Sequence, residues 1–432
     1  MFQRHSFQHK TWFSIVSSMI VLLVSLSACG GSPNAAPSFT NNNPITIGIS
    51  LSLTKDFSSD GLAMQQGYQL WADAINNSGG LLGRPVQLKI LNDQSDPALA
   101  AKNYETLISQ DHVNLVMGPF STLLTKAAAP VVQKHGYAFV EGAGGAPSVF
   151  DGVVKQGWHN LFAVSVPVGN NLVAFAYYIL SLPKDQRPKT AAYLSSDDPF
   201  TYPQLQTAQA LLEQGGVKTV YSDLNVNDLY PDGNAQKNAA DTKQLMAKKP
   251  DIVLLGTLLP DLQVEVSLFK QYKFNPQAVI ATAGPDLGGD FIHAIGGIKY
   301  SEGIFVPNGW YPQADNFQNA QMVSAYLAKY GGTEDQINAD IAEAYSVGQV
   351  IQQAVTKTQS LDNAKLIAEI SSGDVFNTVQ GTAKFDKVTA PDAGQNLQAI
   401  AYLFQWQGGQ LIPVYPYSVA QQNPEFPRPA NF

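Results

Sequence analysis

Short apolar runs alternate with amphipathic stretches along most of the chain. Ile45–Leu51 has the length and apolarity of a buried strand, and apolar residues then recur at helical spacing from Leu62 to Ile75. Val86–Ile90 alternates apolar and polar residues like a second strand. Asp96-Pro97 opens another helix, because aspartate is a favoured N-cap and proline a favoured first residue. The pattern predicts a repeating strand–helix order.

The same order continues towards the C-terminus. Further strands are predicted at 113–117, 137–140, 190–194, 217–221, 251–255, 278–281 and 303–306. Helices are predicted at 122–135, 172–182, 204–214, 236–248, 262–272, 317–330, 341–358 and 364–370, before two antiparallel strands at 382–385 and 397–406. Strands that alternate with helices form parallel sheets with helices on both faces. The units are too many for one open sheet, so the sequence predicts an α/β fold with two lobes.

The N-terminal segment differs from the rest of the chain. Basic residues are followed by an apolar run from Trp12 to Leu26, which ends at Leu-Ser-Ala-Cys29. This order is typical of a secretory signal peptide, expected at 1–28. Leu-Ser-Ala-Cys also resembles the bacterial lipoprotein signal, whose cysteine is acylated. We therefore expect a lipid on Cys29 and a flexible tether over 29–43, the alternative being a stray thiol in an ordinary signal.

Charge and cysteine content exclude several classes of protein. The chain has 26 basic and 34 acidic side chains, a formal net charge of −8, and no basic block, so nucleic acid is not expected as a partner. Cys29 is the only cysteine, which excludes an internal disulfide and a cysteine metal cluster.

No enzyme signature occurs in the sequence. The G-x-S-x-G, H-E-x-x-H and Walker motifs are all missing, and the histidines after the signal peptide are far apart in sequence. Asp223-x-Asn225-x-Asn227 begins like a calcium loop but has Asp228 and Asn234 where glycine and glutamate are needed, so it is interpreted as a polar loop. We predict no catalytic residue, no metal and no cofactor.

In doubly wound sheets, ligands bind where strands end and helices begin. The candidate segments of the first lobe are Phe57–Asp60, Phe120–Thr122 and Gly142–Gly145. Helix N-termini have free N–H groups that attract anions, and Ser121 and Thr122 add hydroxyls. Simple helix capping by these two residues is the open alternative.

Several segments together resemble one known family. They are INNSGGLLGRPVQL, NDQSDP, VMGPFSTLLTKAAAPVVQKHG, PDIVLLGTLLPDLQVEVSLFKQYKF, AEAYSVGQVIQQAV and GTAKFD. The chain resembles type I periplasmic binding proteins, specifically the leucine/isoleucine/valine-binding protein family of branched-chain amino acid ABC transporters, from about 44 to 417. The resemblance implies two Rossmann-like lobes joined by three hinge crossings, with the ligand cleft between them. Lobe 1 would span 44–164 and 310–395, lobe 2 would span 165–309 and 396–417, and 418–432 would be a C-terminal tail.

The resemblance also implies ligand-binding positions in lobe 1. Thr122, together with Ser121, stands where the family binds the ligand carboxylate. Ala143, Gly144 and Gly145 stand where it supplies backbone groups and a hydroxyl, and the hydroxyl is missing here.

Further positions follow in lobe 2. Phe200 and Tyr202 lie in the segment whose aromatic residue closes over the ligand, and Leu258 or Leu259 replaces a second aromatic. Asp286 in Gly-Pro-Asp-Leu corresponds to the acid that binds the ammonium group. A helix N-cap before 291–295 is the alternative role for Asp286.

These features together predict an extracytoplasmic, lipid-anchored solute-binding protein. It would bind an amino acid or a similar small carboxylate or amide between two closing lobes, as a monomer, and deliver it to an ABC permease with its ATPase subunits. A ligand-sensing receptor subunit that signals through a membrane partner is the alternative, and an enzyme on the same fold is a third hypothesis.

Overall fold

The computed structural model describes residues 39–224, 229, 234–385 and 393–430. The expected signal peptide and Cys29 lie outside these residues, as do Asn225 and Asn227 of the polar loop. Among the helices that are described, none is both long and apolar enough to span a membrane.

The first sheet has five parallel strands in the order β2-β1-β3-β4-β5. They are β1 (Ile45–Leu51), β2 (Val86–Asn92), β3 (Leu115–Met117), β4 (Phe139–Glu141) and β5 (Leu161–Ala163). β1 pairs with β2 in the register Ile45 to Val86 through Leu51 to Asn92. Because each strand is followed by a helix that returns to its amino end, all the carboxyl ends lie at one edge of the sheet.

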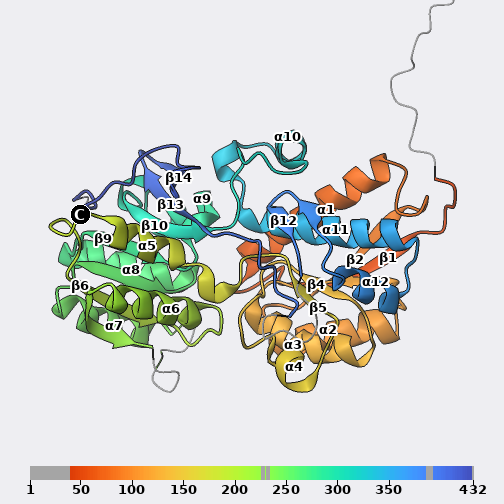
Figure 1. Ribbon diagram of the computed structural model, residues 1–432, viewed down its shortest axis with the longest axis horizontal. Helices are drawn as coiled ribbons and strands as arrows, with labels where there is room; N and C mark the ends of the chain where they lie inside the picture. Colours follow the sequence, from red (N-terminus) through yellow and green to blue (C-terminus); the bar gives the residue numbers. More distant parts are fainter. Residues whose placement is uncertain (1–38, 225–228, 230–233, 386–392, 431–432) are drawn as a thin grey trace, which may run out of the picture. The chain divides into compact units, whose positions relative to one another are not determined.

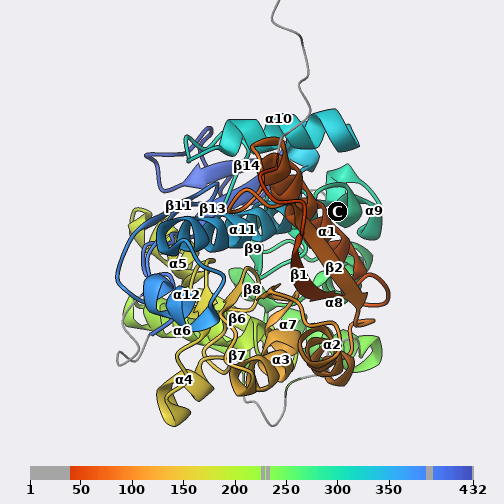
Figure 2. The same cartoon turned by 90° about the vertical axis from the view of Figure 1, so that its right-hand side faces the viewer.

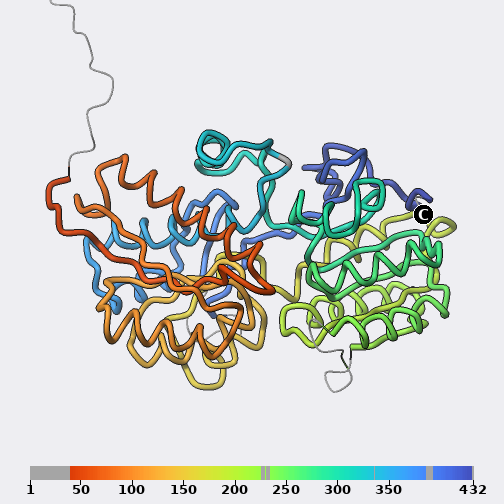
Figure 3. The backbone as a smooth tube through the Cα atoms, turned by 180° about the vertical axis from the view of Figure 1, so that it is seen from behind, coloured from red at the N-terminus to blue at the C-terminus, as the bar shows by residue number. Residues whose placement is uncertain are grey.

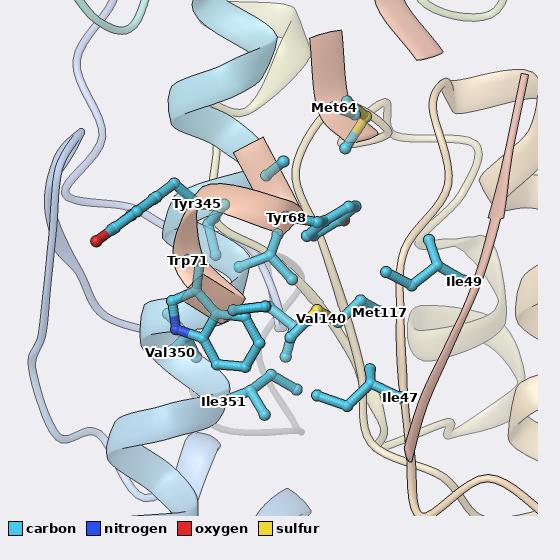
Figure 4. Close-up of a cluster of buried hydrophobic side chains, with 14 of the residues drawn as sticks. Ile47, Ile49, Met64, Tyr68, Trp71, Met117, Val140, Tyr345, Val350 and Ile351 are labelled. Atoms are coloured by element: carbon cyan, nitrogen blue, oxygen red, sulfur yellow. The ribbon is translucent and has the colours of Figure 1, made fainter. Parts of the chain in front are cut away.

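Helices cover both faces of this sheet (Figures 1 and 2). One face packs against α1 (Ser58–Asn77) and α11 (Ala339–Thr358), and the other against α2 (Pro97–Ser109), α3 (Thr122–Lys134) and α4 (Asp151–Gln156). Figure 4 shows the first of these cores, in which strand residues such as Ile47 and Val140 meet Trp71 and Val350 from the two helices. This packing fixes α11, which comes from late in the chain, onto the first sheet.

The second sheet has seven strands in the order β14-β13-β10-β9-β8-β6-β7. The strands β6 (Thr190–Ser195), β7 (Lys218–Asp223), β8 (Ile252–Gly256), β9 (Ala278–Ala281) and β10 (Ile304–Asn308) are parallel. β13 (Tyr402–Gln407) and β14 (Gln410–Tyr415) complete it as antiparallel strands. The cores on the two faces are separate: α5 (Val173–Ser181) and α6 (Thr201–Gln214) form one, and α7 (Ala235–Ala247), α8 (Leu259–Tyr272) and α9 (Gly289–Ala294) form the other.

The chain passes between the two sheets three times. The first crossing lies between β5 and β6, and the second follows β10 and leads through α10 (Asn319–Tyr330) to α11. The third connects the small hairpin of β11 (Phe376–Thr378) and β12 (Gly381–Ala383), which follows α12 (Asn363–Ile370), to β13. Side-chain hydrogen bonds fix the second crossing, since Trp310 Nε1 donates to Asn319 Oδ1 at 2.7 Å. The predicted fold class, two α/β lobes with three crossings, is confirmed.

Some helices and strands begin at other residues than predicted, or were not predicted at all. The helix expected from Leu62 begins at Ser58, because Gly61 is a helical residue and not the end of a loop. A Cβ atom at Gly61 would collide with the carbonyl oxygen of Ser52, so glycine lets the first turn of α1 approach the end of β1. The short β5 was missed, and so was β14, whose Pro413 is tolerated because β14 is an edge strand.

Both ends of the described chain are attached to the folded body. Asn41 N donates to Gly83 O at 3.1 Å, and Arg84 Nε donates to Asn43 O at 2.8 Å, so the last residues of the expected tether rest on the first sheet's half. At the other end, Arg428 is buried and its N–H donates to Gln277 O at 2.7 Å. The C-terminal residues therefore pack onto the second sheet's half (Figure 3).

Candidate functional site

A cavity of about 160 Å³ lies where the carboxyl ends of strands from both sheets meet. Its lining comes from the segments after β1, β3, β4 and β5, from those after β6, β8, β9 and β10, and from the first turn of α11. Nine residues singled out in the sequence line it: Phe57, Asp60, Phe120, Ser121, Ala143, Phe200, Leu258, Leu259 and Asp286. The structure thus brings together residues that are more than 200 positions apart in the sequence.

Four predicted residues do not line the cavity: Thr122, Gly144, Gly145 and Tyr202. Thr122 is the fully buried first residue of α3. Gly144 turns its N–H towards the carboxylate of Glu141. A ligand contact by any of the four residues stays a prediction.

The N-terminus of α1 forms one wall of the cavity. Phe57 is the residue before the helix, and its N–H donates to Ser95 Oγ at 3.0 Å. Its ring meets that of Phe120 edge to face, with 5.6 Å between ring centroids. The two rings, together with Phe200 from the other side, give the cavity apolar surfaces between its polar groups.

Ser121 stands at the N-terminus of α3. It occupies the N-cap position, but its side chain makes no capping hydrogen bond, and Oγ is buried without a partner. The capping alternative therefore fails for Ser121. Its hydroxyl and the helix N-terminus form a site at which an anionic group would be favourable.

Asp286 lies on the opposite wall, in the 3₁₀ turn Pro285–Leu287. Its Oδ1 accepts a hydrogen bond from Gly284 N at 2.8 Å. The alternative role as N-cap of the following helix is wrong, because α9 starts at Gly289 and Gly288 takes the cap position. Burial raises the pKa of Asp286 to about 6.

Sequence reasoning missed the acids that α11 brings to the cavity. Asp340 and Glu343 lie in the first turns of α11 and line the same cavity as Asp60 and Asp286. The only sequence signal was the pair of acids at the start of a helix, a pattern equally typical of the helix dipole. Only packing α11 beside α1 shows that these two carboxylates face a ligand site.

Burial raises the pKa of all four carboxyl groups, and for Asp60, Asp340 and Glu343 neighbouring acids add to the effect. Burial and the charge of Asp286 raise the pKa of Asp60 to about 7, and the Asp60 and Asp340 carboxyls are within hydrogen-bonding reach. Burial and the neighbouring acids raise the pKa of Asp340 well above its usual range. The pKa of Glu343 is raised for the same two reasons, with Glu141 as its strongest charged neighbour.

The cavity lining contains acids without bases. Its acids are Asp56, Asp60, Asp198, Asp286, Asp340 and Glu343, whereas no lysine, arginine or histidine is part of the lining. Over the described ranges, no three histidine, cysteine, aspartate or glutamate side chains are arranged to hold a metal ion. The cavity is therefore suited to a small organic molecule that carries hydrogen-bond donors or positive charge.

The fold and this cavity define the class of protein: two α/β halves that hold a small molecule between the ends of their strands. Residues 44–410 match the family described as periplasmic binding protein, and the chain belongs to that family. Members bind solutes, so the chain is a binding protein and not an enzyme, and its place is outside the cytoplasm.

Curated proteins of the expected branch are similar to this chain. A Leu/Ile/Val-binding protein homolog of Brucella abortus is 23% identical over 415 residues, which cover 92% of this chain and 97% of the relative. The Leu/Ile/Val-binding protein BraC3 of Rhizobium johnstonii is 23% identical over 369 residues, covering 85% and 93%. The predicted family is confirmed.

Solved structures of transporter-associated binding proteins share the fold. A branched-chain amino acid transporter substrate-binding protein of Streptococcus pneumoniae, in complex with isoleucine, is 18% identical with a TM-score of 0.71, covering 85% of this chain and 97% of that one. A solute-binding protein of an ABC transporter from R. palustris, in complex with benzoate, is 17% identical with a TM-score of 0.69, covering 86% and 95%. At these identities the likeness concerns the fold, and the two ligands differ in chemistry.

Proposed function

We propose that this protein is the solute receptor of an ABC importer, which binds an amino acid or a related small molecule between its two halves and delivers it to a permease. One observation carries the proposal: the cavity is lined from both sheets, so a ligand there contacts both halves at once. A ligand that contacts both halves favours the closed arrangement over the open one, which gives the permease a signal of occupancy.

The polar groups of the cavity support an amino-acid-like ligand. Ser121 Oγ and the N-terminus of α3 would take a carboxylate or a carbonyl oxygen. Asp286 would take an ammonium group from the opposite wall. Ala143 and Leu258 stand where the family resemblance expects a hydroxyl and an aromatic side chain, which makes the site differ from that of a leucine-binding protein.

The N-terminal sequence supports attachment to the outer side of a membrane. We propose that Cys29 is acylated and becomes the first residue of the mature protein. Acyl chains would then keep the receptor beside its permease.

A thermal-shift panel with the purified full chain tests the binding function. Amino acids, amides, amines and aromatic acids are added singly, and we expect at least one compound to raise the melting temperature. A ligand at 100 times its Kd stabilises the folded state by about 2.7 kcal/mol. Ser121→Ala should weaken that ligand, whereas Ser267→Ala, on the exposed side of α8, should not. A flat result across every class of compound would contradict the proposal.

A further inference from the structure

We propose, building on the function proposed above, that the ligand is a small organic molecule with at least two cationic nitrogen atoms, such as a diamino acid or a diamine. Molecules that carry only a carboxylate, or a single ammonium beside an apolar chain, should bind much more weakly. Four carboxyl groups line the cavity without a base, two of its buried polar atoms are short of hydrogen-bond donors, and the carboxyl groups stand on more than one wall.

The cavity holds more carboxyl groups than one ammonium group would pair with. Asp60 from α1, Asp340 and Glu343 from α11, and Asp286 from beyond β9 all line it. No cationic side chain of the lining compensates them. A buried carboxylate needs a partner, because desolvation without one is costly. The missing partners are positive groups that the ligand would bring.

Two buried polar atoms of the cavity are short of hydrogen-bond donors. Asp340 is 9% exposed, and apart from the neighbouring Asp60 carboxyl its Oδ2 has no partner; Ser121 is 7% exposed with an unpartnered Oγ. Unsatisfied buried polar atoms are uncommon in folded proteins and usually have a functional reason. The two atoms belong to different helices that both begin at the cavity, α11 and α3, so a single ligand would satisfy both.

Helix capping does not account for the acids of α11. Asn338 is the N-cap residue, and its side chain already accepts the hydrogen bond from Asp340 N at 2.8 Å. Glu343 lies beyond the cap, and burial beside other acids makes its charged form unfavourable. Burying these two carboxyl groups thus costs free energy, and the helix does not need either of them for capping.

A metal ion does not fit the arrangement. In the part of the chain that the structure describes, these carboxylates do not converge on a point as ligands of one ion would. Carboxylates spread over two walls suit separate nitrogen atoms on one molecule. The rings of Phe57, Phe120 and Phe200 supply the apolar surface for the carbon chain between those nitrogens and faces to which cations are attracted.

Isothermal titration calorimetry on the full chain tests the inference. The probes are lysine, ornithine, putrescine, leucine, benzoate and magnesium chloride. We expect at least one of the three compounds with two amines to bind at least tenfold more tightly than leucine, benzoate or magnesium. Binding of lysine or ornithine without putrescine would assign a carboxylate to the Ser121 side, and binding of putrescine would identify a diamine site. Both outcomes support two cationic nitrogens.

Charge-neutralising variants locate the interaction. Asp340→Asn keeps the size of the side chain and should weaken the cationic ligand at least tenfold, since a hydrogen bond to a charged group contributes a factor of this order. Asp73→Asn is the matched control, because Asp73 lies on α1 at the protein surface and pairs with Lys329. Melting curves of the unliganded variants establish that each is folded, and we expect Asp340→Asn to melt no lower than the parent.

Three results would overturn the inference. Tighter binding of leucine or benzoate than of every diamine would refute it and leave the proposed receptor function intact. Equal affinity of the diamine for the parent and for Asp340→Asn would refute the role of the acid cluster. Failure of all probes to bind would refute the inference, and only failure of the wider compound panel as well would count against the receptor function.

Discussion

Glu141 is a carboxylic acid held where water does not reach it. It ends β4, is fully buried, and accepts the N–H of Gly144, while its Oε1 has no partner. Burial raises the pKa of Glu141 to about 8, so the side chain is mostly protonated at neutral pH. The folded state therefore binds a proton here that the unfolded chain, with a glutamate pKa of about 4.3, releases.

This proton gives a testable dependence of stability on pH. The stability contributed by protonated Glu141 is fully present below the unfolded pKa and is lost as pH rises through about 8. Glu141→Gln mimics the protonated form and should not suffer this loss. We expect the variant to melt roughly 2–5 °C higher than the parent at pH 8.5 and nearly equally at pH 5.

Melting temperatures measured by circular dichroism between pH 5 and pH 8.5 check this expectation. Glu334→Gln, on an exposed 3₁₀ turn, is the control and should follow the parent at every pH. A constant difference between Glu141→Gln and the parent over the whole range would show that Glu141 is ionised in the folded protein.

At the scale of elements, the contact between α1 and α11 positions the acid cluster. The two helices lie side by side (Figure 2). They approach closely because glycines face the partner helix: Gly67 lies against the backbone of Ile341, and Gly348 lies against the ring of Trp71. Asp60 and Asp340 stand at the N-termini of these two helices. The distance between the two carboxyl groups is thus set by how closely the helices pack.

Gly67→Ala should disturb both stability and binding. A Cβ atom there would collide with the carbonyl oxygen of Ile341, so α11 would have to move away. We expect a loss of about 2–3 kcal/mol in the free energy of unfolding, although alanine is the better helix former. Urea unfolding measures the loss, and weaker ligand binding should accompany it. Gly289→Ala is the control, since a Cβ atom there meets nothing within 4 Å.

The order of strands and helices could be predicted from the sequence, and so could the residues that follow the strand ends. Ile45–Leu51 is apolar enough to mark a buried strand, and Phe57, Phe120 and Asp286 follow strands at places where doubly wound sheets bind ligands. The role of Asp340 was not readable, because its place depends on which sheet α11 packs against. Gly61 led to a wrong prediction of where the first helix starts. Glycine is needed inside this helix because it lies against Ser52, a tertiary contact that the sequence does not show.

At the scale of the whole molecule, the proposed lipid on Cys29 predicts where the protein is found. In a bacterial host, the parent should sediment with membranes and be released by detergent. Cys29→Ala should be found in the soluble extracytoplasmic fraction or keep its uncleaved signal, because the acylated residue is gone. Asn34→Ala, in the expected tether, should stay with the membranes. Fractionation followed by immunoblotting distinguishes these results, and membrane association of Cys29→Ala after signal cleavage would refute the anchor.

The hydrogen bonds between residues 41–43 and the turn at 83–84 determine which half of the protein the proposed lipid anchor would attach to the membrane. A tether from the membrane would be attached to the half that contains α1, α3 and α11. The half that contains Asp286 would remain free to rotate. Binding and release of the ligand would then occur by rotation of the unattached half relative to the half that is attached to the membrane. Lengthening the tether should change the distance from the membrane that the receptor can reach, without changing its affinity for the ligand.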